Sequence, residues 1–163
     1  DADDLVAVVR QCPSGALQYR RHDGKPDESA PPINVIALRE AGPYAVRGDI
    51  RLEGRSINYR AALCRCGASK NKPFCDASHF AANFSASGEP PSGQTEQLAV
   101  RDGPLAIDPE TDGPLQVRGN MEIMSGTGRV VARVTQARLC RCGQSGIKPF
   151  GDGSHQRTGF RSD

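Results

Sequence analysis

The 163-residue chain is poor in the residues that build large apolar cores. It has no Trp, aromatic residues make up 5% of it, and hydrophobic residues 37%. Gly (18) and Pro (12) are frequent, which favours turns over long helices. A small domain of this composition buries little apolar surface and usually depends on a metal, a disulfide or a partner for stability. We therefore expect one domain or two small ones, with some stabilising element beyond the core.

The sequence lacks the patterns typical of several classes of function. Acidic and basic residues are mixed and the net charge is +2, so no basic stripe indicates nucleic-acid binding. The longest apolar runs, such as residues 5–9, are far shorter than the roughly 18 residues of a membrane span. There is no G-x-S-x-G, no recognisable pair of catalytic carboxylates and no phosphate-binding loop. We expect no nucleic-acid partner, no membrane association and no enzyme activity.

The most informative feature is a group of three thiols and one imidazole within residues 64–79. Cys64, Cys66, Cys75 and His79 have the spacing C-x-C-x8-C-x3-H. Residues i and i+2 of an extended segment face one side, and residues i and i+4 of a helix lie one turn apart. The four side chains are therefore expected to form two pairs. That arrangement suits a [2Fe–2S] cluster, in which each iron takes two protein ligands.

A zinc site is the alternative for the same four residues, because Zn²⁺ also accepts three Cys and one His. Zinc would make the chain a structural or interaction module without redox chemistry. Zinc-binding cysteine pairs are more usually spaced C-x2-4-C, whereas C-x-C places two thiols closely around one metal. The spacing favours iron–sulfur and leaves zinc as the alternative.

The sequence contains an internal repeat. Residues 42–48 recur as residues 113–119, and the cysteine motif recurs as residues 140–155. The extra residues of the second copy fall around residues 125–128, where Ser-Gly-Thr-Gly predicts a longer hairpin turn. Two copies of one supersecondary unit, in register apart from a loop, indicate duplication and a pseudo-twofold arrangement.

The second motif is incomplete. It keeps Cys140, Cys142 and His155, but Gly151 stands where the first motif has its third thiol. Because Gly cannot bind a metal, one iron would be left with His155 and water, Asp152 or an outside thiol. Three interpretations stay open: a purely structural loop, a cluster with a substitute ligand, or an altered position in this sequence. Cys140, Cys142 and His155 are therefore only candidate ligands.

Both units show short β-like segments bounded by Gly or Pro. The predicted strands are residues 33–38, 44–46, 49–52, 57–63, 98–100, 105–107, 115–117, 121–124 and 130–134. Short helices are expected near Asp76 and Asp152, which can cap a first turn, and a short amphipathic helix is expected before Cys12. Residues 85–97 indicate a linker. The chain divides into an amino-terminal segment (1–30), a first unit (31–97) and a second unit (98–163).

The first motif resembles that of the CDGSH-type, mitoNEET-like iron–sulfur proteins. Their pattern, C-x-C-x2-S/T-x3-P-x-C-D-G-S/A/T-H, is met throughout except that Ala77 replaces Gly. The resemblance covers about residues 30–85 and 98–160. It implies a mostly β fold with short helices (α+β), in which a β-sandwich cap carries loop-and-helix lobes that bind the cluster. It also implies that the dimer of such proteins is present here as an intramolecular pseudo-dimer.

Residues 11–17, Gln-Cys-Pro-Ser-Gly-Ala-Leu, resemble the closing segment of a ferredoxin-like domain, in which the Cys before Pro is a cluster ligand. The other thiols of such a domain are not in the sequence. The alternative, that Cys12 is a half-buried thiol at a helix end, stays open.

We expect a cytoplasmic, monomeric [2Fe–2S] protein that acts in electron transfer, cluster transfer or redox sensing, with redox or apo-acceptor proteins as partners. The C-x-C pairs suit shared metal ligation better than disulfides, which indicates a reducing compartment. A His ligand makes the cluster less negative, so its potential should lie above the roughly −400 mV of all-Cys plant-type clusters. Basic residues are expected to surround the cluster: Arg65, Lys70 and Lys72.

Overall fold

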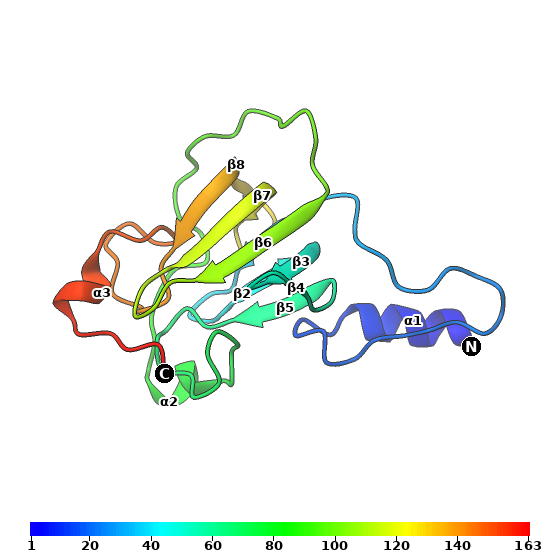
Figure 1. The fold of residues 1–163 in the computed structure, drawn as a ribbon, viewed down its shortest axis with the longest axis horizontal. Helices are drawn as coiled ribbons and strands as arrows, with labels where there is room; N and C mark the ends of the chain where they lie inside the picture. Colours follow the sequence, from blue (N-terminus) through cyan, green and yellow to red (C-terminus); the bar gives the residue numbers. More distant parts are fainter.

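A computed structural model describes residues 1–163, and β-strands dominate it (Figure 1). In chain order the elements are α1 (Ala2–Arg10), β1 (Val35–Leu38), β2 (Tyr44–Arg47), β3 (Asp49–Leu52), β4 (Arg55–Ser56), β5 (Arg60–Leu63), α2 (Ser78–Ala81), β6 (Pro104–Pro109), β7 (Leu115–Met124), β8 (Val130–Leu139) and α3 (Ser154–Arg157). The predicted mostly β fold with few short helices is confirmed. None of the three helices has the length and apolar character of a membrane-spanning helix.

The two units exchange strands within one curled sheet. Inside the units, β1 pairs antiparallel with β2, and β6 pairs antiparallel with the first half of β7. Between the units, β1 pairs parallel with the second half of β7, and β3 pairs parallel with β6. The two pairings between units are equivalent under the pseudo-twofold relation, so each unit completes the sheet of the other. The predicted intramolecular pseudo-dimer is therefore present, with β6–β8 lying across from β2–β5 (Figure 1).

One apolar core serves both units. It is a cluster of 18 buried residues drawn from strands on both sides of the repeat. In β1, Ile36 and Leu38 are fully buried while their neighbours are half-buried, the period of two expected of a strand with one face inward. Leu115 and Val117 of β7 enter the same cluster. Neither unit would bury its apolar face without the other.

Several of the predicted strands differ from the structure. Residues 98–100 form no strand, and Val100 is 54% exposed. The predicted segment 57–63 is shortened to β5. Residues 115–117 and 121–124 join as one strand, β7, with a bulge between Arg118 and Met121. Gly119 permits that bulge: its φ is +128°, and a Cβ there would lie 2.4 Å from the carbonyl oxygen of Pro104. The predicted hairpin at residues 125–128 joins β7 to β8.

The predicted linker, residues 85–97, has no helix or strand and arches over one end of the sheet (Figure 1). It is nevertheless bonded to β8. The Gly93 amide donates to the Val131 carbonyl oxygen at 2.8 Å, and the Arg133 amide donates to the Gln94 carbonyl oxygen at 2.7 Å. The segment therefore extends the fold along an otherwise open strand.

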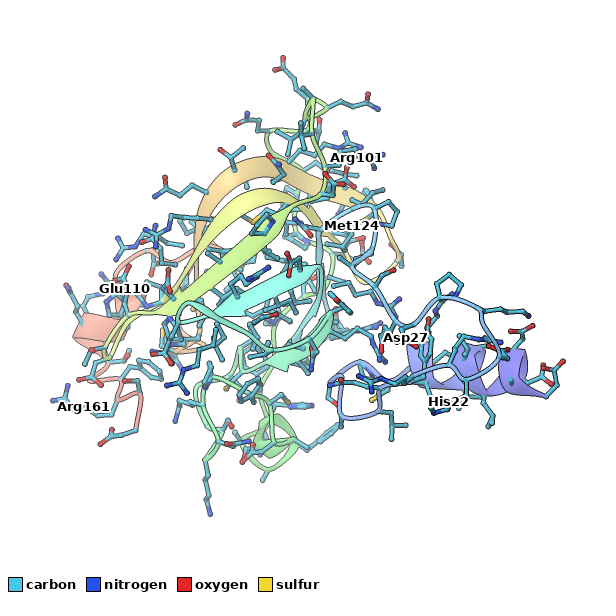
Figure 2. The ribbon with its side chains drawn as sticks, turned by 45° about the vertical axis from the view of Figure 1, so that its right-hand side comes forward. His22, Asp27, Arg101, Glu110, Met124 and Arg161 are labelled. Carbon is cyan, nitrogen blue, oxygen red and sulfur yellow. The ribbon has the colours of Figure 1, made fainter.

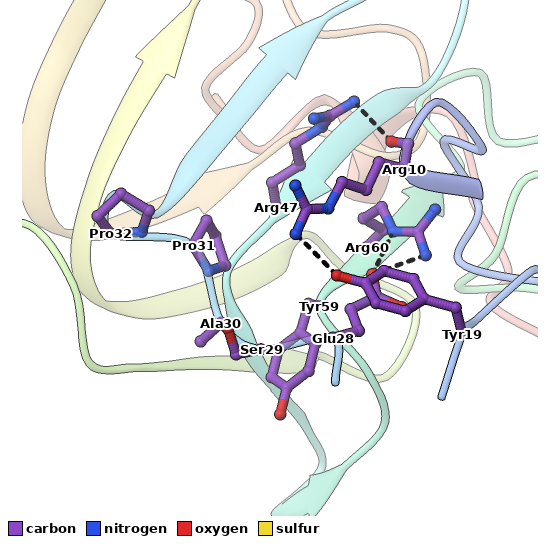
Figure 3. A pocket seen from close by; sticks show the side chains of 10 residues that line it. All are labelled: Arg10, Tyr19, Glu28, Ser29, Ala30, Pro31, Pro32, Arg47, Tyr59 and Arg60. Atoms are coloured by element: carbon purple, nitrogen blue, oxygen red, sulfur yellow. Dashed lines mark hydrogen bonds and ion pairs between the residues drawn. The ribbon is translucent and has the colours of Figure 1, made fainter. Parts of the chain in front are cut away.

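The amino-terminal segment is fastened to the first unit by one buried guanidinium. Arg60 of β5 is 4% exposed and forms an ion pair of 2.7 Å with Glu28 (Figure 3). It also donates to the carbonyl oxygens of Val9, Cys12 and Leu17. A pocket of about 300 Å³ lies along this seam. Since α1 has no buried residue, these polar contacts hold it in place.

Candidate metal centre

The first cysteine loop continues the sheet beyond the end of β5. The Cys64 amide donates to the Pro73 carbonyl oxygen, and the Cys75 amide donates to the Ala62 carbonyl oxygen, both at 2.8 Å. These bonds hold the two distant parts of the motif side by side. The loop therefore places Cys75 next to Cys64 although eleven positions separate them in the sequence.

The four predicted ligands of the first loop come together as two pairs. The Sγ atoms of Cys64 and Cys66 are 3.7 Å apart, and Cys75 Sγ lies 3.5 Å from Nδ1 of His79 on α2. No three His, Cys, Asp or Glu side chains converge closely enough to hold a single ion. Two pairs of soft donors fit a two-iron cluster, in which each tetrahedral iron takes two protein ligands.

Asp76 closes the loop between the two pairs. Its Oδ2 accepts the Lys70 amide at 2.9 Å, and its Oδ1 accepts the Ser78 amide at 3.0 Å. Hydrogen bonds from Ser78 and the Lys70 amide keep the pKa of this carboxyl well below its usual range. Asp76 was expected to cap α2; the N-cap is instead Ala77, in a left-handed conformation with φ 68°. The carboxylate ties the start of α2 back to the loop, so it fixes the position of His79.

One expected neighbour of the cluster has a different role. Arg65 is 1% exposed, and its guanidinium donates to carbonyl oxygens of the turn before β2 and of the segment after α2: Arg39, Gly42, Ala86 and Ser87. Arg65 lies between two predicted ligands, and its guanidinium binds these carbonyl oxygens; its influence on a cluster stays a prediction. Lys72 donates to the Ser69 carbonyl oxygen at 2.7 Å, and Lys70 is exposed.

The loop disfavours the thiolate form of two of its thiols. Burial raises the pKa of Cys66 and of Cys75. The Ala68 amide donates to Cys66 Sγ at 3.3 Å and the Ala77 amide to Cys75 Sγ at 3.4 Å, which partly opposes that effect. Metal binding therefore releases protons, and the two amides are already placed to stabilise the thiolates that result.

The second loop has the same backbone hydrogen bonds as the first. The Cys140 amide donates to the Pro149 carbonyl oxygen and the Gly151 amide donates to the Arg138 carbonyl oxygen, both at 2.9 Å. The Sγ atoms of Cys140 and Cys142 are 3.6 Å apart, and both residues are buried. The structure therefore brings two of the three candidate ligands together and leaves Gly151 in the place of Cys75.

Asp152 is not free to replace the missing thiol. Its Oδ2 accepts the Gly146 amide at 2.9 Å and its Oδ1 accepts the Ser154 amide at 3.0 Å. Hydrogen bonds from Ser154 and the Gly146 amide keep its pKa well below the usual range, as in the first loop. Both oxygens already hold the loop together, so binding iron would compete with these hydrogen bonds.

The two loops contact each other across the pseudo-twofold relation. A Cβ at Gly67 would lie 2.9 Å from the Cys142 carbonyl oxygen, and one at Gly143 would lie 2.7 Å from the Cys66 carbonyl oxygen. Tyr44 of the first unit is fully buried and donates its hydroxyl to the Cys140 carbonyl oxygen. Burial raises the pKa of Tyr44 well above its usual value, so it remains a donor.

Sequence reasoning missed these contacts. They depend on how the repeats pack, and neither Gly67 nor Gly143 stands out from the other glycines of the chain. One signal was available for Tyr44, which stands where the second repeat has Leu115. A hydroxyl group present in one repeat and absent from the other indicates that only the first repeat has a hydrogen-bond partner there.

His22 lies away from both loops, on the amino-terminal segment (Figure 2). Cys12 belongs to the same segment and directly follows the C-cap of α1, Gln11. All six cysteines are free thiols. Cys12 Sγ lies 3.4 Å from Ser14 Oγ, and the hydrogen bond with Ser14 lowers the Cys12 pKa to about 7. A cluster-ligand role for Cys12 stays a prediction.

The fold and the loops define a class of metal-binding protein with two C-x-C loops, each followed by a short helix that carries His. In a comparison with protein families, residues 41–80 and 112–156 match the family described as iron-binding zinc finger, CDGSH type. The match covers just over half of the chain, and the chain belongs to this iron-binding family. A search of curated proteins found no match.

Proposed function

We propose that the chain is a [2Fe–2S] protein that transfers electrons or the cluster itself, or senses redox state, and that it has no substrate of its own. The observation that carries this proposal is the pairing of donors in the first loop. Cys64 and Cys66 would hold one iron and Cys75 and His79 the other. When bound, the cluster supplies a one-electron couple.

The exposure of the four ligands supports exchange with a partner protein. Cys64 is 1% exposed and lies at the end of β5, whereas Cys75 and His79 are half-buried at the surface. Phe80, which follows His79, is 77% exposed, and the two rings lie 4.3 Å apart. An apolar side chain beside the outer pair gives a redox or apo-acceptor protein a contact close to the cluster. The core shared by both units supports a monomer, and six free thiols support a reducing, cytoplasmic setting.

The test is metal and sulfide analysis of anaerobically purified protein, together with its visible spectrum. We expect iron and acid-labile sulfide in equal amounts and absorption bands in the visible. Cys64→Ser should abolish the cluster of the first loop, and His22→Ser should leave it intact. Colourless protein with about one zinc per chain would establish the zinc-stabilised module instead.

A further inference from the structure

The second loop lacks one ligand and little else. Its carboxylate bridge at Asp152, its thiol pair and its short helix all reproduce the first loop. Ser145 Oγ donates to the Phe150 carbonyl oxygen at 2.6 Å, the distance between Ser69 Oγ and the Phe74 carbonyl oxygen in the first loop.

Space remains where the missing thiol would lie. A Cβ at Gly151 would meet nothing closer than Pro114 Cβ at 3.5 Å, an ordinary van der Waals contact, and the φ of Gly151 is not left-handed. A small cavity lies beside it, lined by Cys140, Cys142 and His155 among others. It has about 10 Å³ of water-accessible volume, room for about one water-sized group. The three remaining donors and Gly151 thus border one cavity.

We propose that the second loop holds a second [2Fe–2S] cluster, and that a thiolate from solution fills the position left open by Gly151. This inference rests on the proposed function. Cys140 and Cys142 would hold one iron, and His155 with the outside thiolate the other. Binding replaces a solvent ligand: the thiol loses its proton to solvent, its sulfur bonds to iron, and a water molecule leaves. A thiolate is favoured because a coordinated thiol is deprotonated outright and irons of such clusters prefer sulfur donors.

The two loops would then bind their clusters in different ways. The first loop supplies all four ligands from the chain, whereas the second has one exchangeable position and responds to small thiols. Asp152 already accepts hydrogen bonds from Gly146 and Ser154, so binding iron would compete with them.

The experiment compares the wild-type chain with Gly151→Cys and Gly151→Ala, each reconstituted with iron and sulfide and then desalted with or without 2-mercaptoethanol. We expect the wild type to hold about four irons per chain with the thiol and about two without it, two for each cluster. Gly151→Cys should hold about four in both conditions, and Gly151→Ala, whose methyl group enters the cavity, about two in both. Native mass spectrometry should detect one bound 2-mercaptoethanol per wild-type chain. Ethanol is the matched control without a sulfur.

Each other outcome overturns the proposal. If the wild type stays at two irons with the thiol while Gly151→Cys rises to four, the native second loop holds no cluster. If Gly151→Cys also stays at two, the loop is not a cluster site at all. If the wild type keeps four irons without the thiol, the fourth ligand is not an exchangeable thiolate. Absence of iron and sulfide from every variant would contradict the proposed function itself.

Discussion

His79 is the ligand that distinguishes the first loop from an all-thiolate site. Its Nδ1 lies 3.5 Å from Cys75 Sγ, and its ring contacts the exposed Phe80. We predict that His79→Cys retains a cluster but lowers its midpoint potential by about 100–300 mV, because a second thiolate on that iron adds negative charge. Redox titration followed in the visible measures the shift. His22→Cys, which adds a thiol on the amino-terminal segment, should leave the potential unchanged; loss of the cluster in His79→Cys would contradict the assignment of this ligand.

Cys12 is predicted to be the most reactive thiol of the cluster-loaded chain. The hydrogen bond with Ser14 is the main cause that lowers its pKa to about 7, below the roughly 8.5 of a free cysteine. The rate of its alkylation by iodoacetamide should therefore reach half its maximum near pH 7, as followed by peptide mass spectrometry. Ser14→Ala should move that midpoint upward. An unchanged midpoint in Ser14→Ala would show that the hydroxyl does not stabilise the thiolate.

At the scale of elements, buried arginines hold the loops to the sheet. Arg65 and Arg141 occupy the same place in the two C-x-C motifs, and Arg141 donates to the Gly113 carbonyl oxygen at 2.6 Å as Arg65 does to Gly42 at 2.8 Å. Burial lowers the pKa of both guanidinium groups. Both arginines donate hydrogen bonds to carbonyl oxygens of the turn that precedes β2 or β7. The sequence did not predict this role, because an arginine between two ligands indicates compensation of the cluster's charge.

We predict that Arg65→Lys lowers the free energy of unfolding by about 1–3 kcal/mol, since an ammonium group cannot reach all the carbonyl oxygens that the guanidinium serves. The matched control is Arg55→Lys in β4, which is exposed and should change stability by less than about 0.5 kcal/mol. Denaturant unfolding followed by circular dichroism measures both. Equal effects of the two variants would contradict the role assigned to Arg65.

The attachment of α1 should weaken in acid. Asp3 of α1 pairs with Lys25 at 2.6 Å and with Arg21 at 2.8 Å, and hydrogen bonds from Lys25 and then Arg21 lower its pKa. A carboxyl whose pKa is lower in the folded state stabilises that state above its unfolded pKa of about 3.9, and the contribution is lost as the pH falls below it. Amide hydrogen exchange of α1, corrected for intrinsic rates, should therefore accelerate as the pH falls below about 4.

Arg21→Met should reduce that pH dependence, because one of the two cations that lower the Asp3 pKa is then absent while Lys25 remains. Arg20→Met is the matched control, since the Arg20 side chain is 80% exposed and its Nε lies 3.9 Å from Asp27. Protection of α1 that does not change with pH in the unaltered chain would contradict the ion-pair attachment.

Local patterns predicted most elements and failed where distant segments decide the outcome. β3 begins and ends where alternation placed it, at Asp49 and Leu52. The repeat predicted the hairpin at residues 125–128. Residues 98–100 have the composition of a strand, but they pair with no strand of the sheet, and Val100 is exposed. The bulge in β7 could not be predicted because it depends on the approach of Gly119 to β6.

At the scale of the whole molecule, duplication predicted the pseudo-twofold relation but not the exchange of strands. Spacing predicted the two donor pairs of the first loop, but the helix assumed to carry both Cys75 and His79 is wrong. Helix α2 begins at Ser78, so Cys75 reaches His79 from the loop before it. The pairing of β1 with β7 and of β3 with β6 joins segments far apart in the chain, and no local pattern encodes it. The same exchange brings the two loops into contact at Gly67 and Gly143. The second unit therefore supports the first even where its own motif is incomplete.

That support leads to a prediction about the intact cluster. Gly143→Ala would place a methyl group 2.7 Å from the Cys66 carbonyl oxygen, at a residue with φ +78°. Gly153→Ala adds the same methyl group at φ +85° with nothing within 4 Å, and the first repeat already has Ala77 at that position. Both variants carry a backbone cost of about 1–2 kcal/mol, but only Gly143→Ala forces the loops apart. We expect Gly143→Ala to speed the loss of visible absorbance from the first-loop cluster several-fold at neutral pH, and Gly153→Ala to leave that rate nearly unchanged. Equal rates would mean that each loop holds its metal independently, and that the contact between the repeats serves the fold alone.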